Sequence, residues 1–520
     1  MPLTRWRRRH RRKHNLQSPI RKPERRKKRR NPARPRGPVT EKPKAPKLPT
    51  DSKRTPLSKA STSSTENTSK WTRIDRPFPL PKYVREALQR LNEAGHVAYV
   101  VGGSVRDFFL KRESKDHDIA TSADPDELCR IFPDAITVGK AFGVLKIPIQ
   151  STGDAPPELL EVATFRQDLE YEDHRHPKAV RFSGAVEDAS RRDFTVNALY
   201  YDPKTSRVLD PANGLDDLSD RILRAIGNPR ARFKEDALRL LRAVRFASTL
   251  EFTIEPKTAE AIKTKANLIN HVSAERIREE LTSMWCGPHP ALALELLSKF
   301  GLLRLILPEV EALHGVSQSP LHHPEGDVWN HTVKVMKCLS AQISRRPSSL
   351  AWAALLHDIG KPAAASRSGG KNFTAHEVDG VKMAIVIGER LKMSAQEIAA
   401  ISAIISDHVK FREVFQMREA TLQRFIHQPH FEEMLALHKA DATASDGNLA
   451  FFEFCSSRLA EKKTALSSAK LIDGNDLIQL GLKPGKEFSE ILRTVEDLAL
   501  EKKLHTKDEA LEYVVKHFVK

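Results

Sequence analysis

The chain has 520 residues, enough for several domains, and carries 86 Lys and Arg against 67 Asp and Glu, a net charge of +19. Residues 1–60 hold 23 basic and three acidic residues, so the remainder has a net charge of −1. No apolar run reaches the ~18 residues of a transmembrane helix, so no membrane partner is expected. The four cysteines form no CxxC pair, which excludes a cysteine-based zinc site and fits a reducing, cytoplasmic compartment.

Residues 1–75 form a basic arm that contains RWRRRHRRKHN and then Pro/Lys-rich and Ser/Thr-rich stretches. We expect the arm to be disordered, because it lacks the apolar residues whose burial would offset the entropy lost on ordering. Its charge favours sequence-independent contact with nucleic-acid phosphates over a merely solvated tail. A transit peptide is a third interpretation, although the arm has no amphipathic periodicity.

Residues 76–205 have the pattern of a mixed α/β unit, in which ordered structure begins near Phe78. The predicted helices cover 83–95 and 124–132, and the predicted strands cover 96–103, 136–149, 158–166 and 178–184. The strand over 96–103 runs directly into a pair of glycines. This unit is therefore expected to be a head built on a mixed sheet with helices.

Beyond Asp216 the pattern becomes helical. The predicted amphipathic helices cover 235–250, 258–269, 273–285 and 290–301. We divide this part of the chain into a neck and body over 206–320, a histidine-rich domain over 321–460 and a small helical appendix over 461–520. The predicted fold class is an α+β head followed by all-α domains.

The stretch GGSVRDFFLKRESKDHD combines groups that suit a nucleoside triphosphate. Gly102 and Gly103 let backbone amides approach a ligand closely, and Arg106 offers a positive fork for phosphate. Asp116 and Asp118, if they lie on a strand, point to the same face about 7 Å apart and can hold divalent cations. A glycine pair on its own is usually a turn, and a DxD motif on its own is usually a solvated loop. The order and closeness of the two motifs favour a site for a nucleoside triphosphate instead.

The stretch RFKEDALRLLRAVRFA places Glu235, Arg239 and Arg242 at i, i+4 and i+7 of one expected helical face. Asp236 precedes Arg239 by three residues, so these two side chains are also expected to be neighbours. Taken alone, the pattern indicates an intrahelical salt bridge of small energetic worth.

The motifs GGSVRD, KDHDIAT, RRDFTVNAL and RFKEDALRLLRAVRFA follow one another in an order that resembles class II CCA-adding tRNA nucleotidyltransferases and bacterial poly(A) polymerases. The similarity covers residues 78–300 and implies a polymerase-β-like head. It implies transfer of nucleotides from CTP and ATP to the 3′ end of tRNA or another RNA, without a template. The basic arm is then expected to contact the RNA backbone.

The resemblance also assigns site residues. It implies that Asp116 and Asp118 bind catalytic Mg²⁺, with Glu161 of EVATFR a candidate third carboxylate. The residues expected to contact the nucleotide are Gly102, Gly103, Arg106, Arg192, Asp193, Asn197, Asp236, Arg239 and Arg242. Among them, Asp236 and Arg239 are implied to read the base.

The chemistry of the bases is consistent with that assignment. Cytosine and adenine each present an amino donor beside an acceptor nitrogen, which a carboxylate and a guanidinium match. Uracil and guanine present the reverse order, so the same pair would face donor with donor and acceptor with acceptor. Such buried mismatches make discrimination strong.

A second constellation occupies the histidine-rich domain, in HHPEGDVWNHT, LLHDIGKP, FTAHEVDG, ISDHVK and LHKADATAS. Its order resembles the H…HD…H…H…D pattern of HD-domain phosphohydrolases. The implied metal ligands are His331, His357, Asp358, His376, His408 and Asp441. The resemblance implies phosphatase or 2′,3′-cyclic phosphodiesterase activity with a divalent metal whose identity stays open.

Several functions remain open within this resemblance. We favour CCA addition over poly(A) synthesis, because Ala141 in VGKAFGVLKI stands where poly(A) polymerases typically have a second basic residue and because those enzymes usually lack an HD domain. Partial addition, of A only or of CC only, is a third possibility. The Asp116 and Asp118 pair argues against an RNA-binding hydrolase with an inactive polymerase head.

Overall fold

The structure, a computed structural model, describes residues 71–114, 116–137, 143–149, 158–171, 177–321, 323–370, 372–461 and 470–519. The disorder expected of the arm up to residue 70 lies outside the described residues. The described structure begins earlier than the predicted start at Phe78, because Trp71–Arg73 form strand β1. This strand pairs with β9 (Arg207–Leu209), and Trp71 is opposite Leu209.

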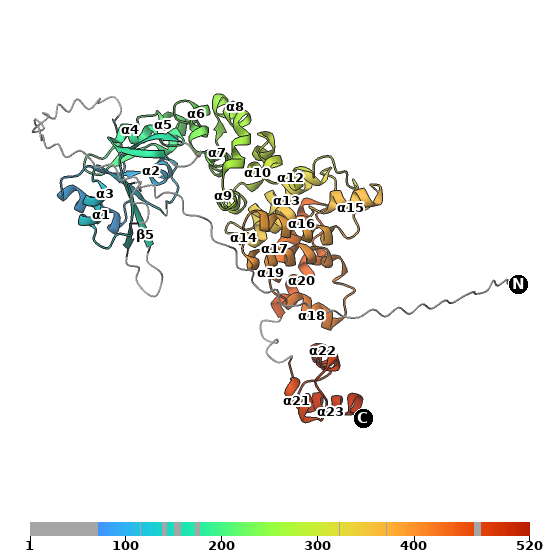
Figure 1. The fold of residues 1–520 in the computed structure, drawn as a ribbon. Coiled ribbons are helices and arrows are strands. Elements are labelled where there is room, and N and C mark those ends of the chain that lie inside the picture. The colour runs from blue at the N-terminus through green and yellow to red at the C-terminus, as the bar shows by residue number, and fades with distance from the viewer. Residues whose placement is uncertain are drawn as a thin grey trace, which may run out of the picture. The chain divides into compact units, whose positions relative to one another are not determined.

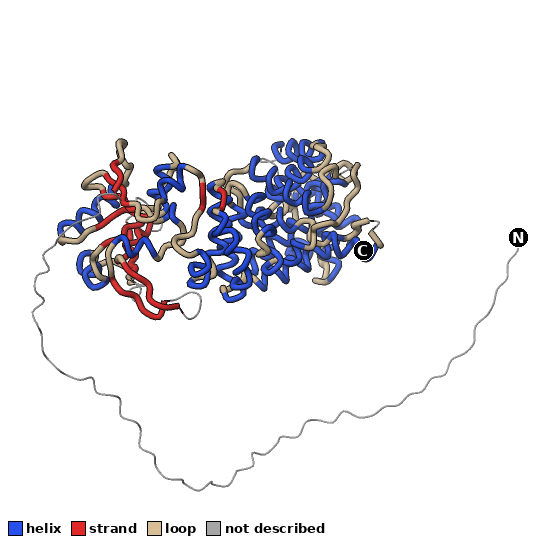
Figure 2. The backbone as a smooth tube through the Cα atoms, turned by 90° about the horizontal axis from the view of Figure 1, so that it is seen from above, coloured by secondary structure: helices blue, strands red, loops and turns tan. Residues whose placement is uncertain are grey.

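The head is built on a mixed sheet of seven strands in the order β1-β9-β8-β2-β3-β5-β4. The further strands are β8 (Tyr200–Asp202), β2 (Ala98–Val101), β3 (Asp118–Thr121), β5 (Glu158–Thr164) and β4 (Val144–Ile149). Only β3 and β5 run parallel, with Ile119 opposite Val162, while the other neighbours are antiparallel. Figure 2 marks the strands in red and the helices in blue, and all the described strands end by Ile254, after which the described elements are helical.

The predicted strand over 136–149 is only partly correct. β4 covers its second half, and Ile136 forms an isolated bridge with Lys146, whereas residues 138–142 lie outside the described residues. The strand predicted over 158–166 is β5, and it is followed by a separate hairpin of β6 (Arg166–Tyr171) and β7 (Pro177–Phe182).

The helices of the head are α1 (Lys82–Glu93), α2 (Gly103–Phe109), α3 (Pro125–Ile131), α4 (Ala185–Ser190) and α5 (Gly214–Ser219). In α1, Val84, Ala87, Leu88 and Leu91 are buried at helical spacing, which confirms the prediction over 83–95. α3 begins at a capping box in which Asp124 and Glu127 satisfy each other's backbone amides. α1 and α3 lie side by side (Figure 1), and Arg90 of α1 donates to the carbonyl of Ile131.

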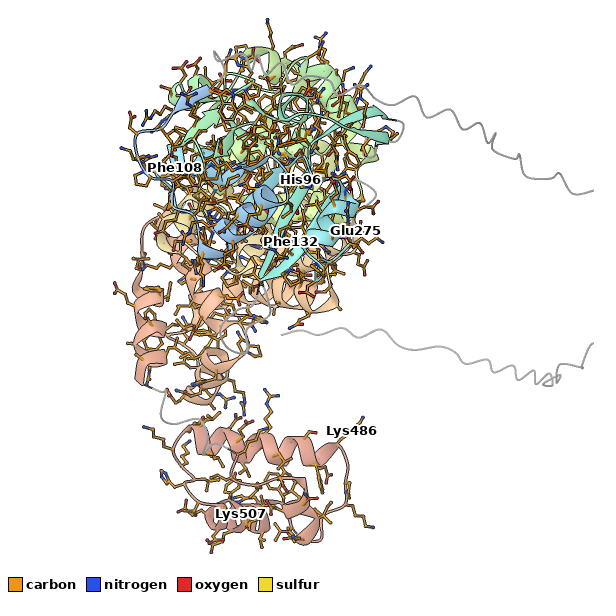
Figure 3. All side chains as sticks on the ribbon, turned by 90° about the vertical axis from the view of Figure 1, so that its left-hand side faces the viewer. His96, Phe108, Phe132, Glu275, Lys486 and Lys507 are labelled. Atoms are coloured by element: carbon orange, nitrogen blue, oxygen red, sulfur yellow. The ribbon has the colours of Figure 1, made fainter. Side chains whose placement is uncertain are left out.

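An aromatic contact joins the start of the head to α2. Phe108, which is labelled in Figure 3, stacks on Phe78 with ring centroids 4.6 Å apart. Phe78 in turn stacks on Tyr201 of β8 at 4.5 Å. Offset aromatic stacking of this kind adds to the burial of apolar area, so this contact fixes α2 against the sheet.

The neck and body contain α6 (Pro229–Glu235), α7 (Arg239–Leu250), α8 (Pro256–Lys265), α9 (Ala274–Cys286), α10 (Pro290–Lys299), α11 (Leu303–Ile306) and α12 (Pro308–Glu311). A short parallel pair, β10 (Ile222–Leu223) and β11 (Thr253–Ile254), lies among them. The helix predicted over 235–250 is confirmed over 239–250, and only its start is wrong. α6 ends at Glu235, Asp236 has extended backbone angles, and α7 begins at Arg239.

The histidine-rich part is a helical bundle of α13 (Val328–Gln342), α14 (Ser348–Leu356), α15 (Lys361–Ser368), α16 (His376–Arg390), α17 (Ala395–Asp407), α18 (Glu419–His427), α19 (Phe431–Ala444) and α20 (Ala450–Glu461). All residues of α14 from Leu350 to Leu356 are buried. A helix that is apolar on every side belongs in the centre of a core. α14 therefore delivers the next two residues, His357 and Asp358, into the protein interior.

The C-terminal appendix has its own small core. It consists of α21 (Gly474–Gln479), α22 (Lys486–Leu500) and α23 (Lys507–Phe518). Lys486 and Lys507, labelled in Figure 3, begin two of these helices. Buried Leu477, Ile491 and Val514 come from all three helices and belong to one apolar cluster.

Candidate functional site

Three carboxylates meet where β3 and β5 run parallel. Asp118 opens β3, and Glu161 lies on β5, next to the residue that pairs with Ile119. Asp116 precedes the strand, so the prediction of both aspartates on one strand holds only for Asp118. Burial, together with the charges of Glu161 and Asp116, raises the pKa of Asp118 to about 6, although Arg192 acts to lower it. Three carboxylates that repel one another in this way fit a divalent cation, which would relieve the repulsion.

Gly102 brings the backbone against these carboxylates. Its φ of +75° lies in the region that favours glycine, and a Cβ added there would lie 3.7 Å from Asp118 Oδ2 and 3.6 Å from Arg192 Nη1. Gly103 then begins α2. The glycine pair therefore allows the chain to turn between an acid and a guanidinium, and its contact with a ligand stays a prediction.

A cleft of about 640 Å³ contains nearly all the predicted residues of this site. Its lining comprises Gly102, Gly103, Arg106, Asp107, Ser114, Asp116, Asp118, Arg192, Asp193, Asn197, Asp236, Arg239, Arg242, Arg245 and Phe246. All nine residues predicted to contact the nucleotide are among them. Glu161 is the one predicted residue of this site outside the lining, although its charge acts on Asp118.

Arg192 is fixed in the cleft by two buried partners. Its Nε donates to the hydroxyl of Tyr200 at 2.8 Å, and its Nη2 lies 3.2 Å from Asp188 Oδ2. The Tyr200 hydroxyl donates to the same Asp188 oxygen at 2.7 Å. Burial alone would lower the pKa of Arg192, but Tyr200 and Asp188 raise it, so the guanidinium stays charged. Asp188, which stands three residues before the RRDFT motif, was not among the predicted site residues.

Asp193 is buried and pairs with the partly exposed Arg242, and both residues line the cleft. Arg242 donates from Nε at 2.9 Å and from Nη2 at 2.7 Å to Asp193 Oδ2. Asn197 and the amide of Phe194 donate to Oδ1. Burial would raise the pKa of Asp193, but Arg242 and Asn197 hold it at about 2. Asp193 therefore fixes the side chains of Arg242 and Asn197. Arg242 is the partly exposed member of the pair and carries its positive charge.

Arg106 is oriented through the same network. Its Nε and Nη2 donate to the two carboxylate oxygens of Asp107 at 2.9 and 3.0 Å, and its Nη1 donates to Asn197 Oδ1 at 2.8 Å. Asp107 was also not among the predicted site residues. Its position directly after Arg106 in GGSVRD was the available signal.

The predicted base-reading pair lies at the break between α6 and α7. Arg239 Nη1 donates to Glu235 Oε2 at 2.8 Å, so the expected salt bridge exists although the two residues belong to different helices. Asp236 contacts Arg276 of α9 at 3.0 Å instead of the side chain of Arg239. Both members of the pair therefore line the cleft, and each is held by a separate partner.

The six predicted HD ligands come together in the helical bundle. His331 lies on α13, His357 and Asp358 follow α14, His376 begins α16, His408 follows α17 and Asp441 lies on α19. Asp358 is central. Its Oδ2 lies 3.2 Å from Nε2 of His357, and its Oδ1 lies 3.3 Å from Nε2 of His376. Asp441 Oδ1 lies 3.1 Å from Nε2 of His331.

The orientation of the four imidazoles suits metal ligation. Nδ1 of His357, His376 and His408 each donates to a backbone carbonyl, at 2.9, 2.9 and 2.6 Å. Nδ1 of His331 donates to Glu325 Oε1 at 2.6 Å. These partners only accept, so they place the proton on Nδ1 and turn the Nε2 lone pairs towards the centre.

The electrostatics of His408 and Asp358 also fit a cation, whereas Asp441 and Glu325 outweigh burial and raise the pKa of His331 to about 9. Burial lowers the pKa of His408 to about 3, with a further contribution from His357. Burial would raise the pKa of Asp358, but His357 and Lys361 hold it well below its usual range. Two groups that share Asp358 could each hold a metal ion: His331, His357 and Asp358, and Asp358, His376 and His408. Neutral imidazoles and ionised carboxylates are the forms that bind a divalent metal, whose identity the geometry leaves open.

Three known families match this chain. The "Poly A polymerase head domain" model matches residues 98–224, the "Probable RNA and SrmB-binding site of polymerase A" model matches 251–313 and the "HD domain" model matches 328–441. The CCA-adding enzyme of Lactobacillus helveticus is 33% identical over 435 residues, which cover 82% of this chain and 94% of that protein. The chain belongs to the CCA-adding enzyme family.

Solved structures of this family share the fold. The Bacillus stearothermophilus CCA-adding enzyme in complex with CTP has 26% identity and a TM-score of 0.64, and the match covers 84% of this chain and 98% of that one. The Thermotoga maritima CCA-adding enzyme complexed with tRNA has 18% identity and a TM-score of 0.54, with 84% and 96% covered, which shows the fold alone. The domain bounds drawn from the sequence stay predictions.

Two residues that contact the HD cluster of this CCA-adding enzyme family member were not among the predicted ligands. Glu325 orients His331, and Lys361 Nζ lies 2.7 Å from Asp358 Oδ2 and donates to Gln318. Both residues occur in the quoted motifs, HHPEGDVWNHT and LLHDIGKP, so the signal was present.

In the part of the chain that the structure describes, no helix is long and apolar enough to cross a membrane.

Proposed function

We propose that this chain adds CCA to the 3′ end of tRNA from CTP and ATP without a nucleic-acid template, as expected of a cytoplasmic enzyme. Membership of the family supports this proposal. The observation that carries it is one cleft that joins Asp116 and Asp118, a set of fixed arginines and the Asp236 and Arg239 pair. These groups suit the metal, the triphosphate and the base of one nucleotide.

The triphosphate is assigned to the arginine side of the cleft. Asp188 and Tyr200 hold Arg192, Asp107 holds Arg106 and Asp193 holds Arg242 through contacts within the protein. A guanidinium fixed in advance loses little entropy when it meets phosphate, and its charge is already aligned for the transition state. Mg²⁺ held by Asp116, Asp118 and Glu161 would supply charge neutralisation at the reacting phosphate and acidify the attacking 3′-hydroxyl.

Base choice is assigned to Asp236 and Arg239. The carboxylate accepts from the amino group of cytosine or adenine, and the guanidinium donates to the adjacent ring nitrogen. Both residues lie at the break between α6 and α7 and line the cleft. A protein surface that offers one acceptor and one donor selects the edge shared by C and A, so a template is not required.

The test of this function is addition by the purified protein. A tRNA that ends before CCA is incubated with each labelled triphosphate alone and with CTP and ATP together. We expect two C residues from CTP alone and a complete CCA end from the mixture. A long A tail from ATP would establish poly(A) synthesis instead, and addition stopping at CC, or A added only to a CC end, would establish partial addition.

For the HD cluster we propose a metal-dependent phosphohydrolase activity. Six converging ligands support a divalent metal, whose bound water would serve as nucleophile. Lys361, which is buried beside Asp358, suits a substrate phosphate. The test is opening of 2′,3′-cyclic AMP to an adenosine monophosphate, and release of phosphate from a phosphomonoester, after titration with Mg²⁺, Mn²⁺ or Ni²⁺. His357→Ala should abolish both reactions while nucleotide addition continues.

A further inference from the structure

The segment between α12 and α13 belongs to neither of the family models beside it, because one model ends at residue 313 and the other begins at residue 328. The described residues of this segment form a loop whose two ends are tied together. The Asp327 carboxylate accepts from the amide of Gly315 at 2.7 Å, and the amide of Val328 donates to the carbonyl of Val316 at 3.0 Å. A loop with joined ends holds its side chains in place, so this segment can form part of a site.

Two polar side chains of this loop reach the HD cluster. Glu325 binds Nδ1 of the expected ligand His331, as described above. Gln318 Oε1 accepts from Lys361 Nζ at 2.6 Å. Gln318 is 8% exposed and Lys361 is 6% exposed, so this second contact lies in the protein interior. The loop therefore holds both a metal ligand and a cation that stands beside the ligands.

The Lys361 ammonium is shared between a charged acceptor and a neutral one. Its Nζ lies 2.7 Å from Asp358 Oδ2, in addition to the contact with Gln318. Asp358 belongs to both groups that could hold a metal ion, so a bound metal would share its negative charge. Gln318 is the one acceptor of this ammonium among the described residues that is not an expected ligand. A neutral amide can fix the position of the ammonium without cancelling its charge.

The orientation of the Gln318 amide indicates the kind of ligand that belongs here. An ammonium has three N–H donors and no acceptor, so it takes Oε1 and turns Nε2 away from itself. Nε2 is buried and has no hydrogen-bond partner among the described residues. A buried donor without an acceptor is costly for a fold, and a ligand that brings several acceptor oxygens would remove the cost. A phosphate group is such a ligand, and it also carries the charge that an ammonium attracts.

We propose that Gln318 is a positioning residue of the HD site, which holds the Lys361 ammonium in place for a substrate phosphate. This role rests on the proposed phosphohydrolase function. It extends the HD site to the loop before α13, outside the matched HD model.

The experiment measures binding of inorganic phosphate to the full-length protein in the presence of Mn²⁺, by isothermal titration calorimetry. Gln318→Leu removes the acceptor of the ammonium and should raise the Kd for phosphate by roughly tenfold, the usual effect of losing a hydrogen bond to a charged group. Gln318→Glu keeps an acceptor but neutralises the ammonium, so it should also weaken binding. The rise in Tm on addition of Mn²⁺ should be the same in Gln318→Leu as in wild type, because Gln318 is not an expected metal ligand.

A double-mutant cycle separates positioning from a structural effect. Lys361→Met should abolish phosphate binding at the HD site, and any binding that remains belongs to the arginines of the nucleotide cleft and is subtracted. Gln318→Leu combined with Lys361→Met should bind no more weakly than Lys361→Met alone, because Gln318 acts through the ammonium. A structural role would instead weaken binding further in the combined variant and would lower the metal-dependent rise in Tm.

Gln423 provides a matched control. It is a buried glutamine of α18 whose Oε1 also has no hydrogen-bond partner among the described residues, and its Nε2 donates to Glu419 instead of a group of the HD cluster. Gln423→Leu should therefore leave the Kd for phosphate at the wild-type value.

Two outcomes would overturn the proposal: wild-type phosphate affinity in Gln318→Leu, or equal weakening by Gln318→Leu with Lys361 present and absent. Failure of the phosphohydrolase function is distinguishable from both. In that case the wild-type protein with metal hydrolyses neither 2′,3′-cyclic AMP nor a phosphomonoester, while its phosphate affinity still reports on Gln318. Hydrolysis with an unchanged KM in Gln318→Leu would instead remove Gln318 alone from the site.

Discussion

Nε2 of His376 lies 3.2 Å from Nε2 of His408, and the Nδ1 atom of each ring is hydrogen-bonded to a backbone carbonyl. A neutral imidazole carries one N–H, and here the carbonyl takes it. Two nitrogen lone pairs therefore face each other across a distance normally bridged by a proton or a metal. Asp358, 3.3 Å from the first ring, adds a negative charge to the same point. This geometry is the physical basis for expecting a cation in the HD cluster.

The first prediction is that divalent metal stabilises the protein through these ligands. After treatment with EDTA, added metal at a hundredfold excess over its dissociation constant should stabilise the folded state by about 2.7 kcal/mol, seen as a rise in Tm. His408→Ala should reduce the shift strongly. His427→Ala removes a histidine outside the cluster, whose ring is hydrogen-bonded to the carbonyl of Gln423. This variant should show the same metal-dependent shift in Tm as the wild type. Equal shifts in wild type and His408→Ala would contradict the assignment.

The second prediction concerns the carboxylates at β3 and β5. Asp118→Asn should reduce nucleotide incorporation by roughly a thousandfold or more, because charge stabilisation by a bound metal contributes several kcal/mol. Binding of tRNA, measured by fluorescence anisotropy, should stay within twofold, since the carboxylate is assigned to metal. Asp134→Asn alters an exposed aspartate of the head and should incorporate normally. Near-normal incorporation by Asp118→Asn would remove this residue from the site.

The third prediction concerns pH and the buried Asp193. Arg242 and Asn197 hold its pKa at about 2, below its ordinary value of 3.8, despite burial. Because the pKa of Asp193 is lower in the folded state than in the unfolded state, its ionised carboxylate stabilises the fold at pH values above the ordinary pKa of 3.8. This stabilisation is lost as the pH falls through about 2. The shift corresponds to about 2 kcal/mol.

Asp193→Asn should therefore lower Tm near pH 7, and the difference from wild type should shrink as the pH approaches 2. Asp220→Asn, a change at an exposed aspartate, serves as the control. Differential scanning calorimetry between pH 2.5 and 7 measures the two curves. A difference that stays constant over this range would mean that the pair contributes no proton-linked stability.

The fourth prediction tests the base-reading pair directly. Asp236→Ala should relax the exclusion of UTP and GTP, because the acceptor for the amino group is gone. Arg239→Ala should reduce the use of CTP and ATP together, because the ring nitrogen loses its donor. Each lost partner costs about 1–3 kcal/mol, roughly tenfold to a hundredfold in kcat/KM. A pair that serves only as a salt bridge would leave the preference among the four triphosphates unchanged.

The fifth prediction concerns the basic arm, which lies almost wholly outside the described residues. Deletion of residues 1–69 removes most of the excess positive charge of the chain. If the arm contacts RNA phosphates, the deletion should weaken tRNA binding and flatten the dependence of log Kd on log salt, because fewer counterions are released. Titrations between 50 and 300 mM KCl measure the slope. The same slope with and without the arm would show that the arm makes no phosphate contact.

Local structure followed the sequence wherever periodicity and end signals were strong. The predicted helix over 83–95 is α1, and the strand before the glycine pair is β2. The predicted helix over 235–250 was wrong at Asp236. No proline or glycine marks that break, and the hydrophobic spacing continues through it. Contacts from distant residues stabilise the interruption: Arg276 bonds Asp236, and the carbonyl of Arg191 accepts from Arg239.

The sequence alone therefore determined most of the elements and the residue types of both candidate sites, because motif order and short-range spacing are local properties of the chain. Only the tertiary structure decided how those residues are held. Asp188, Glu325 and Arg276 each orient a predicted site residue, and Arg276 is 40 residues from its partner. No periodicity encodes a contact over such a separation. It exists because α9 packs against α7, and that packing depends on the burial of apolar side chains along the whole bundle.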